Sequence, residues 1–289
     1  MLIRTFGLAV LLAASSALAT PALASLFFFS TGNPDGRIAT ATRPSTGAPF
    51  EIESADDFVL TDGTALRSAT FTGLIPTGSA VQNVVVEIYR VFPKDSDVGR
   101  TSGAPTFSTS QVPTRVNSPS DVAFDTRESA NNGLTFSTSV LSAAFTAANS
   151  VQPGGIHPDP NFHTGGDGAV TGQEVELSVS FTNPLTLPTD HYFFVPQVQL
   201  DSGDFLWLSA PKPIVPPGTP FPLGFTDLQS WTRDQFLDPD WLRVGADIVG
   251  GTTFNAAFSL TGATIPEPAG IALLALGLAG MAAVRRKLH

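Results

Sequence analysis

The 289-residue sequence has no cysteine, which excludes a disulfide framework, a thiolate zinc site and a cysteine nucleophile. Charged residues are scarce, at 14% of the chain, against about 25% in an average soluble domain. Trp and Tyr number only 3 and 2, whereas Phe occurs 22 times. Because Trp and Tyr are the rings that tolerate half-wet positions, this bias favours a buried core over an aromatic sugar-binding platform.

Basic residues are fewer than acidic residues, so the formal net charge is −10. Setting aside the charged residues of the two ends leaves 11 basic and 24 acidic residues, a net charge of −13 for the interior. Such a body repels nucleic-acid phosphates and anionic lipid headgroups alike. We therefore expect no nucleic-acid partner.

The common catalytic motifs are missing from the sequence. It contains no G-x-S-x-G elbow, H-E-x-x-H motif, P-loop or dinucleotide fingerprint. The interior has three histidines, His157, His163 and His191, so a Ser-His-Asp triad has few candidate bases. A glycosidase needs two carboxylates about 5–10 Å apart. Among so many acidic residues, the sequence does not single out such a pair. We expect that the chain is not an enzyme, and an extracellular hydrolase is the less favoured alternative.

The N-terminal residues 1–24 have the three parts of a secretory signal peptide. Arg4 supplies the positive charge, an apolar run follows, and Ala22 and Ala24 form an A-x-A cleavage site. The mature chain is therefore predicted to begin at Ser25, after export through the Sec machinery. An uncleaved N-terminal anchor is the alternative.

The C-terminal segment, residues 265–289, contains an apolar run of 16 residues from Ala269 to Val284. As a helix this run reaches about 24 Å against ~30 Å of hydrocarbon, which is marginal for a permanent span. Pro266 and Pro268 cannot continue a helix backwards, so the predicted helix begins after them. Three basic residues follow the run and hold its far end on the cytoplasmic side: Arg285, Arg286 and Lys287.

The sequence Pro266-Glu267-Pro268, followed by an apolar helix and a basic cluster, resembles the PEP-CTERM sorting signal of Gram-negative bacteria. The resemblance implies that exosortase, a membrane protease-transferase, reads these three residues and removes the helix near Ala269. It also implies that Arg285 and Arg286 stop transfer. The protein would be anchored transiently and then reach the cell surface or the extracellular matrix of a producer of exopolysaccharide. A plain C-terminal anchor is the alternative.

The body, residues 25–264, shows the period of two that is typical of β-strands. Val175, Leu177, Val179 and Phe181 face one way and polar residues the other. The same alternation occurs in residues 253–262. Many short strands with Gly, Pro and Asp turns predict a single antiparallel β-sandwich of jelly-roll type.

Some local features of the body carry their own predictions. Asp62-Gly63 joins two strand-like runs and indicates a hairpin turn. Residues 83–92 are apolar on both faces and suit a central strand, whereas Pro196 pushes the run 191–200 towards an edge or bulge. Residues 139–151 are the one candidate for a short helix. Six prolines between Ser209 and Gly224 predict a stiff, extended surface loop.

Metal sites are considered at several acidic segments. In an extracellular β-protein, calcium can hold loops together through oxygen ligands. Three acidic pairs are candidates for such a site, although each is also a typical turn: Asp95 and Asp97, Asp201 and Asp204, Asp238 and Asp240. The twelfth position counted from Asp95 is Thr106 rather than Glu, so an EF-hand is excluded. One further loop carries imidazoles and carboxylates that suit a divalent metal, in no established ligand spacing: His157, Asp159, His163 and Asp167.

A carbohydrate-binding patch is considered after the proline-rich segment, where Trp231, Arg233, Asp234 and Trp241 lie close in sequence. The alternative is that both Trp residues anchor the core. We therefore expect a secreted, exosortase-sorted protein of the surface or extracellular matrix with a structural or interaction role, without a cofactor. A carbohydrate- or calcium-binding module is the alternative.

Overall fold

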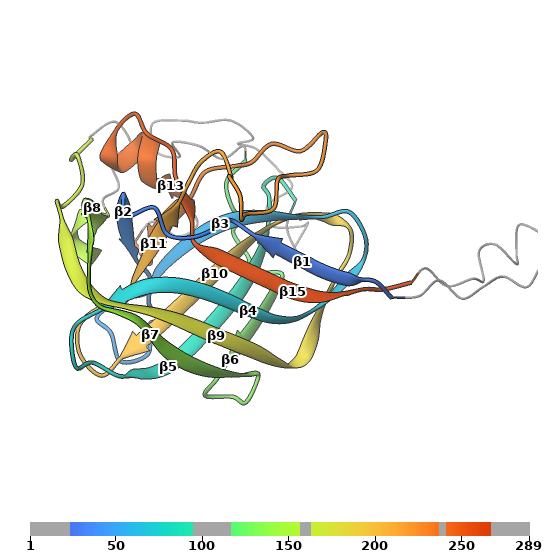
Figure 1. The fold of residues 1–289 in the computed structure, drawn as a ribbon, viewed down its shortest axis with the longest axis horizontal. Coiled ribbons are helices and arrows are strands. Elements are labelled where there is room, and N and C mark those ends of the chain that lie inside the picture. The colour runs from blue at the N-terminus through green and yellow to red at the C-terminus, as the bar shows by residue number, and fades with distance from the viewer. Residues whose placement is uncertain (1–23, 95–116, 157–162, 237–240, 267–289) are drawn as a thin grey trace, which may run out of the picture. The chain divides into compact units, whose positions relative to one another are not determined.

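The computed structural model describes residues 24–94, 117–156, 163–236 and 241–266 (Figure 1). Ser25–Ile265 forms one compact unit. Its strands are β1 (Leu26–Ser30), β2 (Ile38–Ala41), β3 (Ile52–Leu60), β4 (Thr64–Ile75), β5 (Val81–Arg90), β6 (Asp125–Glu128), β7 (Leu134–Ala147), β8 (Asn149–Val151), β9 (Val170–Leu187), β10 (Asp190–Leu200), β11 (Leu206–Ala210), β12 (Trp231–Asp234), β13 (Leu242–Arg243), β14 (Asn255–Ala256) and β15 (Phe258–Thr264). Two short helical segments are η1 (Pro153–Gly155) and η2 (Val244–Val249).

The strands form two sheets. A nine-stranded sheet has the path β1-β15-β4-β11-β2-β8, with β9 pairing both β4 and β7 and with β14 pairing β11. A six-stranded sheet has the order β13-β12-β3-β10-β5-β6. The mainly β prediction is therefore confirmed. The predicted purely antiparallel pairing needs one correction, because β2 and β8 pair in parallel.

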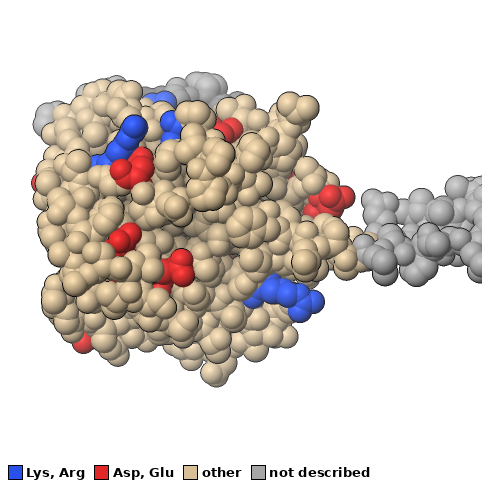
Figure 2. All heavy atoms as spheres, viewed as in Figure 1, with Lys and Arg blue, Asp and Glu red and all other residues tan. Residues whose placement is uncertain are grey.

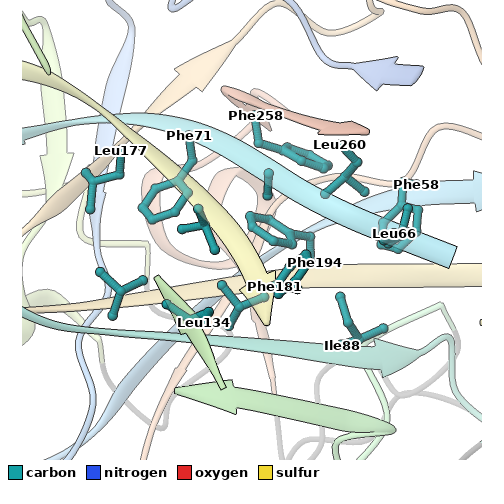
Figure 3. Packing of buried hydrophobic residues seen from close by; sticks show 14 of the residues in the cluster. Phe58, Leu66, Phe71, Ile88, Leu134, Leu177, Phe181, Phe194, Phe258 and Leu260 are labelled. Atoms are coloured by element: carbon teal, nitrogen blue, oxygen red, sulfur yellow. The ribbon is translucent and has the colours of Figure 1, made fainter. Parts of the chain in front are cut away.

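The principal hydrophobic core draws on both sheets and explains the abundance of Phe. Phe71 on β4 and Phe258 on β15 meet Phe194, which comes from β10 of the other sheet (Figure 3). The ring centroids of Phe194 and Phe258 are 5.1 Å apart, and those of Phe71 and Phe194 are 6.1 Å apart. Fully burying one such side chain contributes about 1.5–3 kcal/mol. These aromatic contacts hold the two sheets together.

The alternation read from residues 173–181 is confirmed. Val175, Leu177, Val179 and Phe181 are all buried on β9, and the residues between them are half-buried or exposed. The apolar run 83–92 supplies β5, which lies between β10 and β6 as predicted for an internal strand.

The hairpin predicted at Asp62-Gly63 is wrong. These residues connect β3 of the six-stranded sheet to β4 of the nine-stranded sheet, so the two strands do not pair. Leu60 at the end of β3 and Leu66 on β4 are both fully buried in the shared core. Because each strand turns an apolar face towards the other sheet, the chain crosses between the layers here instead of folding back within one.

Two further local predictions are corrected. The helix considered for residues 139–151 is absent, because this segment continues β7 against β9 and then forms β8. Sheet pairing overrides the helix propensity of its alanines. Pro196 does not place β10 at an edge, since β10 pairs with both β3 and β5. The pairing with β3 ends at Phe194, so Pro196 lies beyond it and keeps only its register partner on β5, Val86.

Between β11 and β12 no regular strand forms over residues 211–230, called here the proline-rich loop. The loop lies against β1, since Thr219 N–H donates to the Ser30 carbonyl at 2.7 Å. Phe221 in the loop packs edge-on against Phe29, with ring centroids 5.7 Å apart. The loop is thus fixed to the body at its middle, while Leu223 and Phe225 are exposed.

Candidate functional site

The end of the body that leads into the C-terminal segment is built by the first and last strands. β1 pairs antiparallel with β15 (Figure 1), and in this register Leu26 lies opposite Ala263. Ser25 N–H donates to Thr264 Oγ1 at 2.9 Å, and Thr264 N–H donates to the Ser25 carbonyl at 2.9 Å. The residue predicted to become the mature N-terminus is thereby tied to the residue that precedes the Pro-Glu-Pro motif by two positions.

The motif begins where the backbone hydrogen bonds of the body end. Ile265 N–H donates to the Gly63 carbonyl at 2.6 Å. Pro266 has no N–H to donate, and a residue before proline is held extended. The chain therefore leaves the body as an extended peptide at Pro266, which is exposed.

Most of the predicted sorting and processing residues lie outside the described residues. Ala24 and Pro266 are described and exposed. The others lie beyond: Ala22, Glu267, Pro268, the run 269–284, Arg285, Arg286 and Lys287. Within the described ranges, no helix has the length and apolar character needed to cross a membrane.

A buried polar cluster lies on β3, β5 and β12. The Tyr89 hydroxyl donates to Glu53 Oε1 at 2.6 Å and lies 3.1 Å from Glu87 Oε2. Arg233 Nε pairs with Glu53 Oε2, and its Nη2 donates to the Tyr89 oxygen at 3.2 Å. A tyrosine has one proton to donate. Because the shorter contact is to Glu53, the contact to Glu87 fits a protonated Glu87 that donates to Tyr89.

The electrostatics of this cluster agree with a protonated carboxyl. Burial, followed by the negative charge of Glu53, raises the pKa of Glu87 from 4.5 to about 8. Burial also raises the pKa of Tyr89, with the charges of both glutamates adding to the effect. Glu53 is paired with the Arg233 guanidinium. The cluster is therefore a satisfied interior network that joins three strands of the six-stranded sheet, β12, β3 and β5.

The carbohydrate patch considered at Trp231 and Trp241 is overturned. The two side chains are 2% and 1% exposed, so neither offers a ring face to a sugar. The Arg233 guanidinium lies 4.4 Å from the Trp241 ring centroid, which places it over the ring as a buried cation–π pair. Asp234 instead accepts the N–H of Phe236 at 2.9 Å. Both Trp residues anchor the core.

A second buried group lies where β3 meets the proline-rich loop. Asp57 Oδ2 is 2.6 Å from His191 Nε2 and accepts the Leu228 N–H at 3.1 Å. On the opposite face of β3, Asp56 Oδ2 accepts the Ala256 N–H at 2.8 Å and so links the strand to β14 in the other sheet. Sequence analysis did not single out Asp56 and Asp57, because an Asp-Asp pair inside an apolar strand carries no recognised motif.

The same group includes a lysine from the loop. Lys212 Nζ lies 2.9 Å from Asp227 Oδ1 and donates to the Asp227 carbonyl at 2.6 Å. Burial raises the pKa values of Asp56 and Asp57. The charge of Asp57 adds to the rise at Asp56, whereas the hydrogen bond from His191 opposes the rise at Asp57. These contacts clamp the loop to the body.

The considered metal ligands are not brought together in the part of the chain that the structure describes. Of the loop set, His163 is exposed, and Asp167 Oδ2 accepts the Gln152 N–H at 2.7 Å. Asp201 accepts the Ala80 N–H at 2.9 Å, and Asp204 pairs with Arg43. Across the described residues, no three His, Asp or Glu side chains are placed to hold a metal ion. Six candidates lie outside these residues: Asp95, Asp97, His157, Asp159, Asp238 and Asp240.

Two open cavities lie at the end of the body opposite Thr264. One of about 260 Å³ is lined by Arg43, Gln199 and Asp201, among others, and one of about 180 Å³ is lined by Leu74 and others. Asp204 lines both. Thr64 at the start of β4 pairs with Thr264, and Leu74 lies ten residues further along the same strand. At about 3.3 Å per residue the separation is roughly 33 Å.

Comparison with known proteins identifies the C-terminal segment. A family model described as the PEP-CTERM protein-sorting motif matches residues 264–287. Searches of curated proteins and of solved structures each found no match. The matched segment starts at Thr264, the last residue of β15, and contains Pro266, Glu267 and Pro268. The resemblance read from the sequence is thereby confirmed.

Proposed function

From the PEP-CTERM sorting motif that this chain carries, we propose that the protein is held briefly in the membrane by residues 269–284 and then released from it. Exosortase cuts near Pro268-Ala269, and the body is passed to the cell surface or the extracellular matrix. The observation that carries this proposal is the match at residues 264–287. The extended exit at Pro266, one residue after the last backbone hydrogen bond of the body, supports it.

The N-terminal part of the proposal is that residues 1–24 are a signal peptide used by the Sec machinery and that the mature chain starts at Ser25. The position of Ser25 supports this assignment. Among the described residues, Ser25 is the first that hydrogen-bonds to the body, through Thr264, and β1 follows directly. Cleavage after Ala24 would therefore leave every strand of the fold intact.

For the mature body we propose a non-enzymatic structural or interaction role in an exopolysaccharide-containing matrix, on a β-sandwich of the two sheets. The shared core of Phe194 and Phe258 supports the sandwich. The non-enzymatic assignment is supported by the state of the buried acids. Glu53, Asp56 and Asp57 are at most 5% exposed and bonded within the protein, so a polymer cannot reach them.

The experiment is intact-mass measurement of the protein recovered from the surface or medium of its native host. The expected mass is that of a chain from Ser25 to the region of Pro268. Replacing Pro266, Glu267 and Pro268 by alanine should leave an uncleaved precursor in the inner membrane. Pro220→Ala, which removes an exposed loop proline outside the motif, should be processed normally. A mature chain that still ends at His289 would exclude sorting by this motif and leave a simple anchor.

A further inference from the structure

The outermost strand of the nine-stranded sheet, β7, has an unusual free edge. It is 14 residues long and contains no charged residue, proline or glycine. Its pairing among the described residues is with β9 alone. Val140 and Leu141 are 57% and 53% exposed. A long edge strand with a free row of N–H and C=O groups is a template for pairing with another strand.

The edge strand β6 of the other sheet is protected in the ways usual for natural proteins. β6 is only four residues long and carries Asp125, Arg127 and Glu128. Short length and charge both prevent edge-to-edge pairing. β7 has neither protection. It has two bulges, between Val140 and Ser142 and between Ser142 and Phe145, so its regular part is Leu134–Val140. Seven uncharged residues without proline or glycine are enough for strand addition.

The rows of side chains that cross the sheet end abruptly at β7. One row on the outer face consists of hydroxyl residues from five strands: Ser137, Ser178, Thr70, Ser259 and Ser30. The next outer row is made in the same way from four strands: Thr135, Ser180, Ser68 and Thr261. Within these rows Thr70 and Ser259 hydrogen-bond at 2.7 Å, and Ser68 pairs with Thr261.

The row between them on the inner face is entirely apolar. It consists of Phe136, Val179, Ala69, Leu260 and Phe29. Phe136 is only half-buried because nothing continues the row beyond β7. The sheet therefore presents at β7 a cross-section of alternating apolar and hydroxyl rows that a further strand of the same pattern would extend.

We propose that this further strand is β7 of a second copy of the chain, paired antiparallel about a twofold axis at Ser137. In that register Ser137 faces its own copy and Thr135 faces Ser139, so hydroxyl groups meet hydroxyl groups. Leu134 faces Val140, so two apolar groups meet, and Phe136 faces Thr138, which is an aromatic–β-branched pair. The segment Leu134–Val140 is self-complementary, as a twofold interface requires, and strand addition extends the sheet across it.

The charge of the molecule favours this edge over other contacts between copies. The interior carries 24 acidic and 11 basic residues, so two bodies repel one another at most orientations. The view in Figure 2 shows a face with few, scattered charged side chains. On β9, Glu174 and Glu176 lie opposite Ser142 and Ser139 of β7. Added salt screens their repulsion across the interface, so association should strengthen with ionic strength, unlike a contact built on ion pairs.

The test uses the mature protein purified from its host and sedimentation analysis over a range of concentrations. Wild type should form dimers, more strongly at 0.5 M than at 0.05 M salt. Ser137→Lys places two like charges directly opposite each other and should weaken association at least tenfold. Ser180→Lys, on the same outer face but one strand inward, should leave it unchanged. Equal circular dichroism and melting temperature establish that both variants fold.

A crosslink tests the register, since the chain has no cysteine of its own. Opposed residues of an antiparallel pair have Cβ atoms about 4.5–5.5 Å apart, so Ser137→Cys should form a disulfide-linked dimer on oxidation. Ser259→Cys lies in the same hydroxyl row on β15 and should form no disulfide-linked dimer. A wild type that is monomeric at every concentration and salt overturns the proposal. A dimer that is not weakened by Ser137→Lys also overturns the proposal. Preferential crosslinking through Ser259 would show that the two copies do not meet at the edge of β7.

Discussion

Ser25 and Thr264 are 239 residues apart in sequence and are hydrogen-bonded to each other through both backbone and side chain. The hydroxyl groups of the two residues also lie 3.0 Å apart. The first strand of the body is thus completed by the last one, and both segments that are predicted to be processed join the body at this one place. Substitutions in β1 should therefore show how much the pairing of these two strands contributes to the stability of the body.

We predict that Phe29→Ala lowers the free energy of unfolding by about 3–4 kcal/mol, because it removes a ring from the core. Phe29 is 4% exposed and lies 5.6 Å from the ring of Phe258. The control on the same strand is Leu26→Ala, which should change stability by less than about 0.5 kcal/mol because Leu26 is 94% exposed. Urea unfolding followed by fluorescence measures both. Equal effects of the two variants would mean that β1 does not close the core.

A second prediction concerns a close approach between β4 and β11. A Cβ added at Gly73 would lie 2.2 Å from Phe205 Cζ and 2.7 Å from the Leu206 carbonyl oxygen. Gly73→Ala should therefore cost about 1–3 kcal/mol through overpacking. Gly154→Ala is the matched control, since a Cβ there meets nothing within 4 Å. Thermal unfolding of both variants tests this, and an unchanged melting temperature for Gly73→Ala would contradict the close packing.

A third prediction concerns the ion pair between Arg233 and Glu53, which are both 5% exposed. Arg233→Met leaves a buried carboxylate without its cation and should cost about 3–5 kcal/mol. Adding Glu53→Gln to the same chain should restore part of this loss, because the unpaired charge is then removed. Arg37→Met should have little effect, since the Arg37 side chain is 62% exposed in its contact with Asp35. Denaturant unfolding of the four chains forms the test. A double variant no more stable than Arg233→Met would contradict the assignment.

A fourth prediction follows from the pKa of Glu87, which burial and the charge of Glu53 raise to about 8. The unfolded chain loses this proton near pH 4.5, whereas the folded protein keeps it until about pH 8. The folded state therefore binds more protons in this window, and its free energy of unfolding should fall as pH rises from about 4.5 to 8.

Glu87→Gln imitates the protonated carboxyl, so it should remove this decline and exceed wild type in stability by about 3–5 kcal/mol at pH 9, since each unit of pKa shift corresponds to about 1.4 kcal/mol. Near pH 4.5 the two proteins should be of similar stability. Urea unfolding at several pH values measures the slope. A variant with the same slope as wild type would show that Glu87 is ionised in the folded protein.

The sequence allowed the mainly β class to be predicted, because a period of two is a local property. Val175 to Phe181 alternate in the sequence and in burial alike. The sheet to which each strand belongs depends instead on contacts between residues that are far apart in the sequence. Asp62-Gly63 has the composition of a hairpin turn, and only the fit of Leu60 and Leu66 into one core shows that the chain crosses between sheets.

The site predictions divide in the same way. The sorting motif is a short linear signal and was recognised directly, as the match at residues 264–287 confirms. The sequence suggests a surface patch at Trp231 and Trp241 because polar residues are close by in sequence, yet Trp241 packs against Arg233 and Tyr89, and both Trp side chains are buried in one cluster. The pairing of Asp57 with His191 joins residues 134 positions apart, which no local pattern reveals.

The position of β15 between β1 and β4 sets the order in which the molecule can be assembled during its export. β15 is the last strand to leave the ribosome, yet it is an interior member of the nine-stranded sheet. Pairs that join distant parts of a chain form late because their loops are long. The sheet therefore stays open until residue 264 has been delivered, and the sorting motif follows directly. The sheet is thus completed at the same time as the sorting motif is exported. A chain whose export stops before β15 would have neither a complete sheet nor the motif.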